Sequence, residues 1–470
     1  MALATITGWL RADEVATGER GWALDLALFR VVLLGAVVAP FAWRALQWTS
    51  RIMPGLPRDA WVPISFFAWL PIDLVADARL AWWLALANLV LVLLALAGVR
   101  TRLTLGAATI LSLYVFGLME NTGKVDHYHH VIWFMALLAI GPSDRFLALD
   151  ARGSREQPTP GGALTTLRAI WVLFGLVYLG PGIAKLLSAV GDGWASAERL
   201  RILVWSQWFA RSLYQPGFVP PRWLDALPSA VLVAGGIAVI AFEVGFVWLV
   251  LFRHVRPVLA AAGVLFHLVN GLVLGIWFAF LLPAYVALVD WAALGRRAFP
   301  ALADGPRVPA PAPRSRGIAA VALVLVVAQA GVSAARLLRP DWAGPRWPFD
   351  LYPTFTSARS AETTVWEPRV LLADGHEPRV DAAAWARAFG SAARSSRTAD
   401  AILREPDPLR RRARSRDVAA LLWDHEPADV RAGALGVTVY EARYTVASRP
   451  VRVGETLLYR FAPDELAARR

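Results

Sequence analysis

Long apolar runs recur along this sequence of 470 residues, and they limit its fold more than any other feature. A bilayer span needs about 20 predominantly apolar residues. Only 18% of the chain is charged, against the roughly 25% usual in soluble domains. The sequence therefore predicts an all-α polytopic membrane bundle of about nine transmembrane helices. The candidate spans are 21–43, 80–98, 103–119, 128–141, 165–187, 229–252, 258–276, 277–291 and 317–337.

Three apolar stretches depart from an ordinary span. The runs at 128–141 and 277–291 are short, and we expect tilted or half-crossing helices buried among the others. The stretch Trp61–Val75 contains two prolines, which disfavour an uninterrupted helix. An interfacial or re-entrant segment is predicted there instead.

Basic residues in the loops predict the orientation in the cell membrane. With a cytoplasmic amino terminus, fourteen arginines fall in cytoplasmic segments, and nine basic residues fall in the longer loops on the opposite face. Nine spans then place the carboxyl-terminal region outside the cytoplasm. Because the net charge of +12 is explained largely by these loops, we expect membrane lipid as a partner and no nucleic acid.

Charged residues are concentrated in the last part of the chain, which separates it from the apolar part before it. The last 132 residues hold 39 charged residues, and they include strand-like runs at 364–371 and 436–446 around an arginine- and alanine-rich helical middle. This pattern predicts a small C-terminal α+β extramembrane domain. The expected segments are a cytoplasmic stretch (1–20), a transmembrane domain (21–295), a proline-rich linker with the last transmembrane helix (296–338) and the extramembrane tail (339–470).

Several kinds of chemistry are excluded by missing residues. The chain has no cysteine, so disulfides, thiolate catalysis and iron–sulfur clusters are ruled out. It also lacks a phosphate-binding glycine loop and the nucleophile elbow of serine hydrolases. Its histidine cluster has no zinc-binding spacing, and no metal is predicted.

Ionisable side chains inside spans are costly and therefore mark candidate functional sites. The histidine cluster could equally be a polar cap at the membrane interface, His267 a hydrogen-bonded packing residue, and Glu243 the structural partner of a buried cation or histidine. The candidates are Asp126, His127, Tyr128, His129 and His130 at the start of the fourth span, Lys185 in the fifth, Glu243 in the sixth, and His267 with Asn270 on one face of the seventh.

Lys185 is the most informative of these residues. Only two of the 48 basic residues are lysines, and this one follows Pro181-Gly182, where we expect a helix break that opens space for a ligand. A desolvated lysine can act as a neutral base, whereas arginine does not lose its proton in proteins. The alternative is a lysine that anchors a helix end by reaching the interface.

Four segments at these places carry a family resemblance. They are LALFRVVLL, VDHYHHVIWFMALLAIGPSDRFLALD, VYLGPGIAKL and FHLVNGLVLGIWF. In order and spacing they resemble the vitamin K-dependent gamma-carboxylases and their bacterial relatives, the HTTM (horizontally transferred transmembrane) proteins, over about residues 20–295. One departure is Asp126, which stands where the family typically has asparagine.

The resemblance implies a function. Lys185 would be the base that deprotonates a reduced menaquinone or vitamin K-type quinol, with O2 and CO2 as co-substrates, and His127 and His267 match the motif histidines. Asp126, His130, Tyr178, Glu243 and Asn270 would bind the quinone or support the site. An exported protein or peptide would be the substrate of carboxylation. The alternative is a non-catalytic membrane scaffold or a lipid- or quinone-binding protein.

Overall fold

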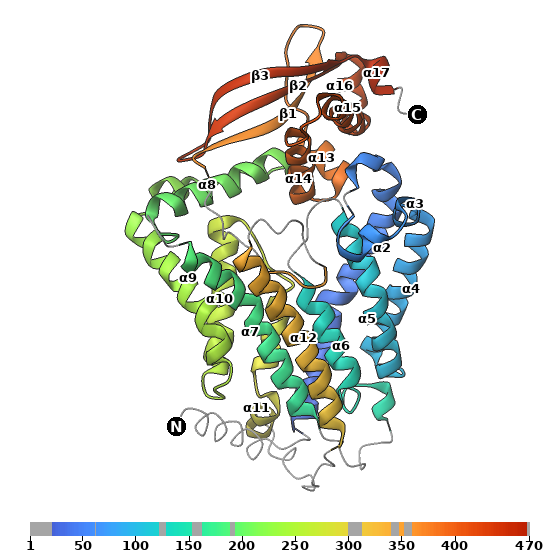
Figure 1. The fold of residues 1–470 in the computed structure, drawn as a ribbon, viewed down its shortest axis with the longest axis vertical. Coiled ribbons are helices and arrows are strands. Elements are labelled where there is room, and N and C mark those ends of the chain that lie inside the picture. Colours follow the sequence, from blue (N-terminus) through green and yellow to red (C-terminus); the bar gives the residue numbers. More distant parts are fainter. Residues whose placement is uncertain are drawn as a thin grey trace.

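The computed structural model describes residues 21–61, 63–121, 128–152, 162–188, 193–298, 313–339, 347–351 and 360–467. Within these residues, seven helices are long and apolar enough to cross a membrane, which confirms a multi-pass helical bundle (Figure 1). They are Gly21–Gly55, α4 (Ala78–Ala97), α5 (Thr101–Leu118), α7 (Ala163–Leu187), α9 (Ser229–Leu249), α10 (Arg256–Leu274) and α12 (Pro313–Leu338).

The first of these helices is not uniform. It contains a π-helical turn, η1 (Leu34–Val38), followed by α2 (Ala39–Arg51). The stretch after it consists of short elements, including η4 (Ser65–Trp69) and α3 (Ile72–Val75), so the prediction that 61–75 does not form a span is confirmed. Other short 3-10 helices are η2 (Met53–Gly55), η3 (Arg58–Ala60), η5 (Met119–Asn121) and η6 (Leu149–Ala151).

The two short candidate spans have different outcomes. The run at 128–141 forms α6 (His129–Ile140), a short buried helix as expected. The run at 277–291 is not a transmembrane helix, because Gly275 ends α10 in a left-handed conformation and only the 3-10 helix η8 (Leu282–Leu288) follows. Most of η8 is buried, which is the condition under which irregular backbone is tolerated at membrane depth.

The chain nevertheless returns to the opposite end of the bundle through this irregular stretch. Arg253, before α10, forms an ion pair of 3.1 Å with Asp290, after η8. The backbone N–H of Ala292 in α11 (Trp291–Ala298) donates to Asp25 near the start of the first helix. The C-terminal domain lies at the other end of the bundle from α11 (Figure 1).

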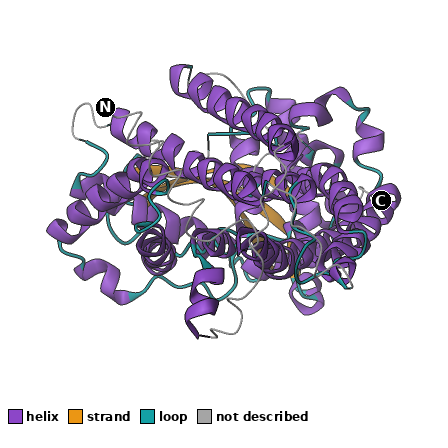
Figure 2. Cartoon of the chain, turned by 90° about the horizontal axis from the view of Figure 1, so that it is seen from below, coloured by secondary structure: helices purple, strands orange, loops and turns teal. Residues whose placement is uncertain are grey.

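Glycines bring α7 and α9 close together. A Cβ on Gly175 would lie 2.8 Å from Cα of Val247, and one on Gly182 would lie 2.9 Å from Cβ of Glu243. Both glycines lie on one face of α7, seven residues apart, so the two backbones can approach without side chains between them. Viewed along the bundle, the helices pack side by side beneath the sheet (Figure 2).

The C-terminal domain (360–467) is an antiparallel three-stranded sheet with helices, which confirms the predicted α+β tail. The sheet has the order β1-β2-β3, with Glu367 of β1 opposite Tyr440 of β2. The third strand was not predicted. The elements are β1 (Glu362–Leu372), α13 (Ala382–Phe389), α14 (Ala392–Leu403), α15 (Pro408–His425), α16 (Ala428–Ala432), β2 (Ala434–Thr445), β3 (Val451–Phe461) and α17 (Pro463–Ala467).

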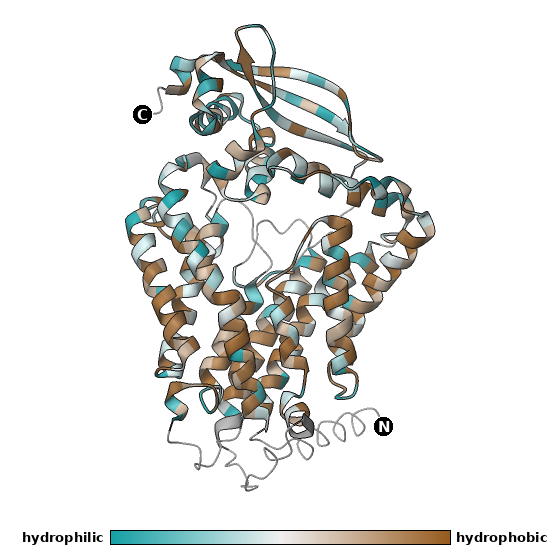
Figure 3. Ribbon diagram, turned by 180° about the vertical axis from the view of Figure 1, so that it is seen from behind, coloured by the Kyte–Doolittle hydropathy of each residue, from teal (hydrophilic) through white to brown (hydrophobic). Residues whose placement is uncertain are grey.

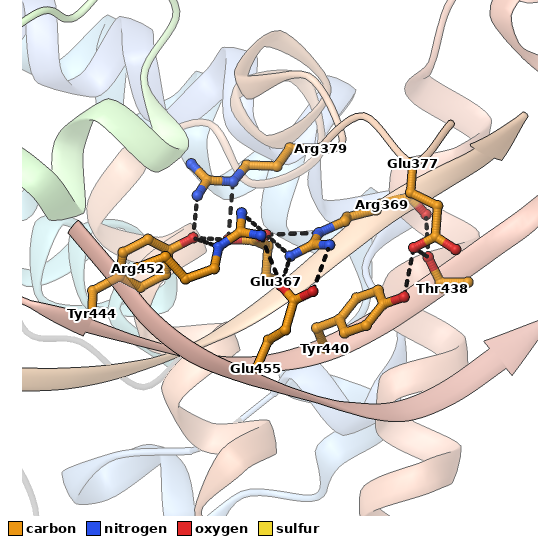
Figure 4. A network of polar contacts seen from close by, with 9 residues as sticks. All are labelled: Glu367, Arg369, Glu377, Arg379, Thr438, Tyr440, Tyr444, Arg452 and Glu455. Carbon is orange, nitrogen blue, oxygen red and sulfur yellow. Dashed lines mark hydrogen bonds and ion pairs between the residues drawn. The ribbon is translucent and has the colours of Figure 1, made fainter. Parts of the chain in front are cut away.

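Charged side chains gather on one face of this sheet (Figure 4). Burial raises the pKa of Glu367, but the hydrogen bond from Tyr444 and the charges of Arg379 and Arg369 outweigh it, so the pKa lies below the usual 4.5. The hydrogen bond from Arg369 likewise lowers the pKa of Glu455. Figure 3 shows more hydrophilic residues in the C-terminal domain than in the bundle, whose helices are predominantly hydrophobic.

Candidate functional site

Lys185 and Glu243 form the central feature of the candidate site. Lys185 Nζ lies 2.5 Å and 2.7 Å from the two carboxylate oxygens of Glu243. The side chains are only 2% and 6% exposed. Glu243 was expected to partner a buried cation or a histidine, and its partner in the structure is the amine of Lys185. The ring of Trp194 lies 5.1 Å from Nζ and covers the pair.

The helix around Lys185 differs from the prediction of a break. α7 continues without interruption from Ala163 to Leu187, with Pro181 inside it. A proline removes one backbone donor, yet here the helix continues, and the neighbouring Gly182 serves close packing against α9. Gly182 thus lets Glu243 approach the lysine, and the Pro-Gly pair does not unwind the helix.

A second polar group lies on the same side of α7, about two turns before the lysine. Tyr178 Oη is 2.8 Å from His267 Nε2 in α10 and 2.5 Å from Tyr285 Oη in η8. His267 Nδ1 is buried and has no hydrogen-bond partner among the described residues. A buried polar atom of this kind normally finds a partner, so this nitrogen is available to a ligand or a water molecule.

Both polar groups face one cavity of about 220 Å³. Side chains of α7, α9, α10 and α8 (Ala197–Tyr214) line it, and most of them are apolar. The polar side chains that line it are Tyr178, Lys185, Glu243, His267 and Asn270. The arrangement can hold an apolar molecule and present its polar end to an amine, a carboxylate and an imidazole.

The structure thus brings together five of the eight predicted site residues. His130 is buried in α6, with Nε2 3.4 Å from the carbonyl oxygen of Phe280, and it does not line this cavity. Asp126 and His127 lie outside the described residues. The cavity lies between the fifth, sixth and seventh predicted spans, because Gly182 draws α9 against α7, and the fourth predicted span contributes no residue to its lining.

Sequence reasoning missed several residues of the site. Tyr285 lies in the stretch assigned to a span, so its hydroxyl gave no signal. Outside this cavity, Glu120 is completely buried and accepts a hydrogen bond from Tyr128, and a carboxylate near the end of an apolar helix could have pointed to it. α8 was not predicted, although Leu200, Leu203 and Val204 have the spacing of one helical face.

No cluster of metal-binding side chains occurs in the part of the chain that the structure describes. The fold and the site together define a multi-pass membrane protein with a polar-ended apolar cavity inside its bundle. The profile of the HTTM domain family matches residues 24–291, more than half of the chain. The chain therefore belongs to the HTTM domain family. No curated protein and no solved structure gives a significant match.

Proposed function

We propose that this HTTM protein is a membrane enzyme that oxidises a reduced isoprenoid quinone of the menaquinone or vitamin K type with O2. The observation that carries the proposal is a buried lysine at the polar end of an apolar cavity within the bundle. An apolar cavity suits an isoprenoid quinol, and it excludes the water that would quench a strong base.

In this proposal Lys185 accepts the proton of a quinol hydroxyl, as the resemblance to the gamma-carboxylases implies. Quinol and O2 give quinone epoxide and water, with one oxygen atom entering each product. The family chemistry couples this oxidation to removal of a γ-proton from a glutamate and to addition of CO2. An exported protein or peptide would supply that glutamate.

Glu243 has a defined part in this chemistry. A lysine must be neutral to accept a proton, and Glu243 is placed to hold the proton that Lys185 gives up. The pair has no net charge either as ammonium and carboxylate or as amine and carboxylic acid. Moving one proton within it therefore adds no unpaired charge to the low-dielectric interior. His267 Nδ1 is available to bind a quinol oxygen.

One observation favours the alternative of a non-catalytic lipid- or quinone-binding protein. Both carboxylate oxygens of Glu243 contact the lysine, so the pair also has the geometry of a structural link between α7 and α9. In that case the cavity would hold a lipid or quinone without turnover. The two functions differ in what arginine can do at position 185.

The test is O2-dependent quinol turnover by purified Lys185→Arg protein. Arginine keeps the charge and can pair with Glu243, but it cannot give up its proton. We expect the variant to fold and to retain extractable quinone, detected by mass analysis, while turnover falls by about 10²- to 10⁴-fold, the usual contribution of a general base. Parent-like turnover would remove Lys185 from the chemistry. Retained quinone with no turnover in the parent would favour the binding protein.

A further inference from the structure

α8 separates the cavity from the C-terminal domain. Leu200, Leu203 and Val204 line the cavity from one face of the helix. Ile202 and Phe209 lie on the opposite face, about 180° away at 100° per residue. There they form a separate apolar cluster with Val365, Ala442, Tyr444 and Val446 of the C-terminal domain. The helix lies across the bundle directly beneath the sheet (Figure 1).

The contact with the sheet is specific. The ring centroids of Phe209 and Tyr444 lie 4.7 Å apart. Tyr444 is itself fixed, because its hydroxyl donates to Glu367 at 2.6 Å in the charged network of the sheet (Figure 4). The position of α8 is thus tied to a hydrogen-bonded part of the C-terminal domain.

A second contact comes from the loop between β2 and β3. Arg449 Nη2 lies 2.9 Å from Asp225 Oδ2 in η7 (Arg222–Ala226), and its guanidinium lies 5.7 Å from the ring of Trp205 in α8. Leu227, directly after η7, lines the cavity. The loop therefore contacts both α8 and the segment that completes the wall beside it.

We propose that α8 is the roof of the cavity and that the C-terminal domain holds this roof closed through Phe209 and Arg449. Displacing the domain would admit water from that side to the polar groups around Lys185. The inference rests on the proposed function for its significance, since quinol oxidation needs a dry site. It makes the C-terminal domain the regulator of that site.

The experiment measures access to the cavity from water. Since the chain has no cysteine, Leu232→Cys places a single thiol on the cavity wall. The full-length protein is reconstituted in lipid nanodiscs and labelled with a small, charged, membrane-impermeant methanethiosulfonate reagent. We expect slow labelling in this background, and about two- to fivefold faster labelling after Arg449→Ala, which removes an exposed ion pair. Phe209→Ala, which removes a buried ring, should accelerate labelling by at least about tenfold.

Two controls make the result specific. Arg410 forms a comparable exposed pair with Asp407 inside the C-terminal domain, so Arg410→Ala should leave the labelling rate unchanged. Arg449→Lys keeps the positive charge and should be labelled as slowly as the Leu232→Cys background. With Arg449→Ala, this variant tests the proposal even if Phe209→Ala fails to fold. Equal rates in the parent, Arg449→Ala and any folded Phe209→Ala protein would overturn the proposal, as would equal acceleration by Arg410→Ala.

Labelling requires neither quinol nor O2, so this outcome is independent of the proposed function. If the parent protein does not oxidise quinol but Arg449→Ala speeds labelling, the proposed enzyme is refuted and the role of α8 as the roof stands. If quinol turnover depends on Lys185 but labelling is unchanged by Arg449→Ala, the enzyme stands and the role of α8 as the roof is refuted.

Discussion

Removing either partner of the Lys185–Glu243 pair should destabilise the protein, and removing both should restore most of the loss. The perturbations are Lys185→Met, Glu243→Gln and the double variant. Methionine keeps most of the apolar stem of lysine, and glutamine keeps the shape of glutamate. These changes therefore test the charges with little change in volume.

The magnitude follows from the distance and the burial. At 2.5 Å, an effective dielectric constant of about 20 gives an attraction of about 7 kcal/mol. Most of it offsets the cost of withdrawing two charges from water. A single variant loses the attraction and leaves one buried charge unpaired, which costs about 3–5 kcal/mol. The double variant leaves no charge, so its stability should lie within about 1–2 kcal/mol of the parent.

The assay is thermal unfolding of the purified, detergent-solubilised protein. A chain of this length has an unfolding entropy of at most about 1 kcal/mol per degree, so each single variant should lower the midpoint by at least about 3 °C. The control is Arg253→Gln, which breaks a pair at the other end of the bundle whose side chains are 30% and 17% exposed. Because solvent screens that pair, its loss should cost about 1 kcal/mol or less.

The double-mutant cycle decides the matter. Independent effects of the two single variants, adding up in the double variant, would mean that the charges do not interact in the folded protein. Single variants as stable as Arg253→Gln would mean that water reaches both groups. Either result would refute the pairing and the mechanism that depends on it.

Three further predictions concern other parts of the chain. Reporter fusions after Leu338 and after Arg297 should report opposite sides of the membrane, because α12 crosses it between them; equal signals would contradict this. Gly182→Ala should lower thermal stability and quinol turnover, because the added methyl group lies 2.9 Å from Cβ of Glu243; parent-like behaviour would show that α7 and α9 do not touch there. Lowering the pH should destabilise the folded C-terminal domain before it destabilises the bundle. The pKa of Glu367 is lowered in the folded state, so its stabilisation is complete above about pH 4.5 and is lost as pH falls through that lowered value. Protection of residues 360–467 from hydrogen exchange that stays constant as the pH falls below about 4.5, after correction for the intrinsic exchange rate, would refute the role of this network.

Hydropathy was sufficient to predict most of the bundle. A helix satisfies its own backbone hydrogen bonds, so an apolar run that crosses lipid needs little help from distant residues. The predicted spans 80–98, 165–187 and 229–252 accordingly agree with α4, α7 and α9 to within a few residues. The run at 277–291 failed because its course depends on burial by neighbouring helices, which composition does not reveal.

The site was predictable in its residues more than in its contacts. The cost of an ionisable group in a span identifies Lys185 and Glu243 one at a time. Their pairing depends on which face of α9 meets α7, and Gly175 and Gly182 fix that face through contacts 61 to 72 residues away in sequence. The position of α8 depends similarly on contacts with a sheet whose residues lie more than 150 positions later in the sequence.

The segment just before the sheet shows how closely the tail and the bundle are joined. Trp347 Nε1 donates to the carbonyl oxygen of Leu113 at 2.7 Å, and Trp133 Nε1 donates to that of Pro348 at 2.9 Å. Gly180 lies in α7, five residues before Lys185, and a Cβ on it would lie 2.8 Å from a methyl carbon of Leu351. This segment follows the family match at 24–291, yet it packs against the helix that carries the candidate base. The tail therefore supports the site from two sides, through this segment against α7 and through the sheet against α8.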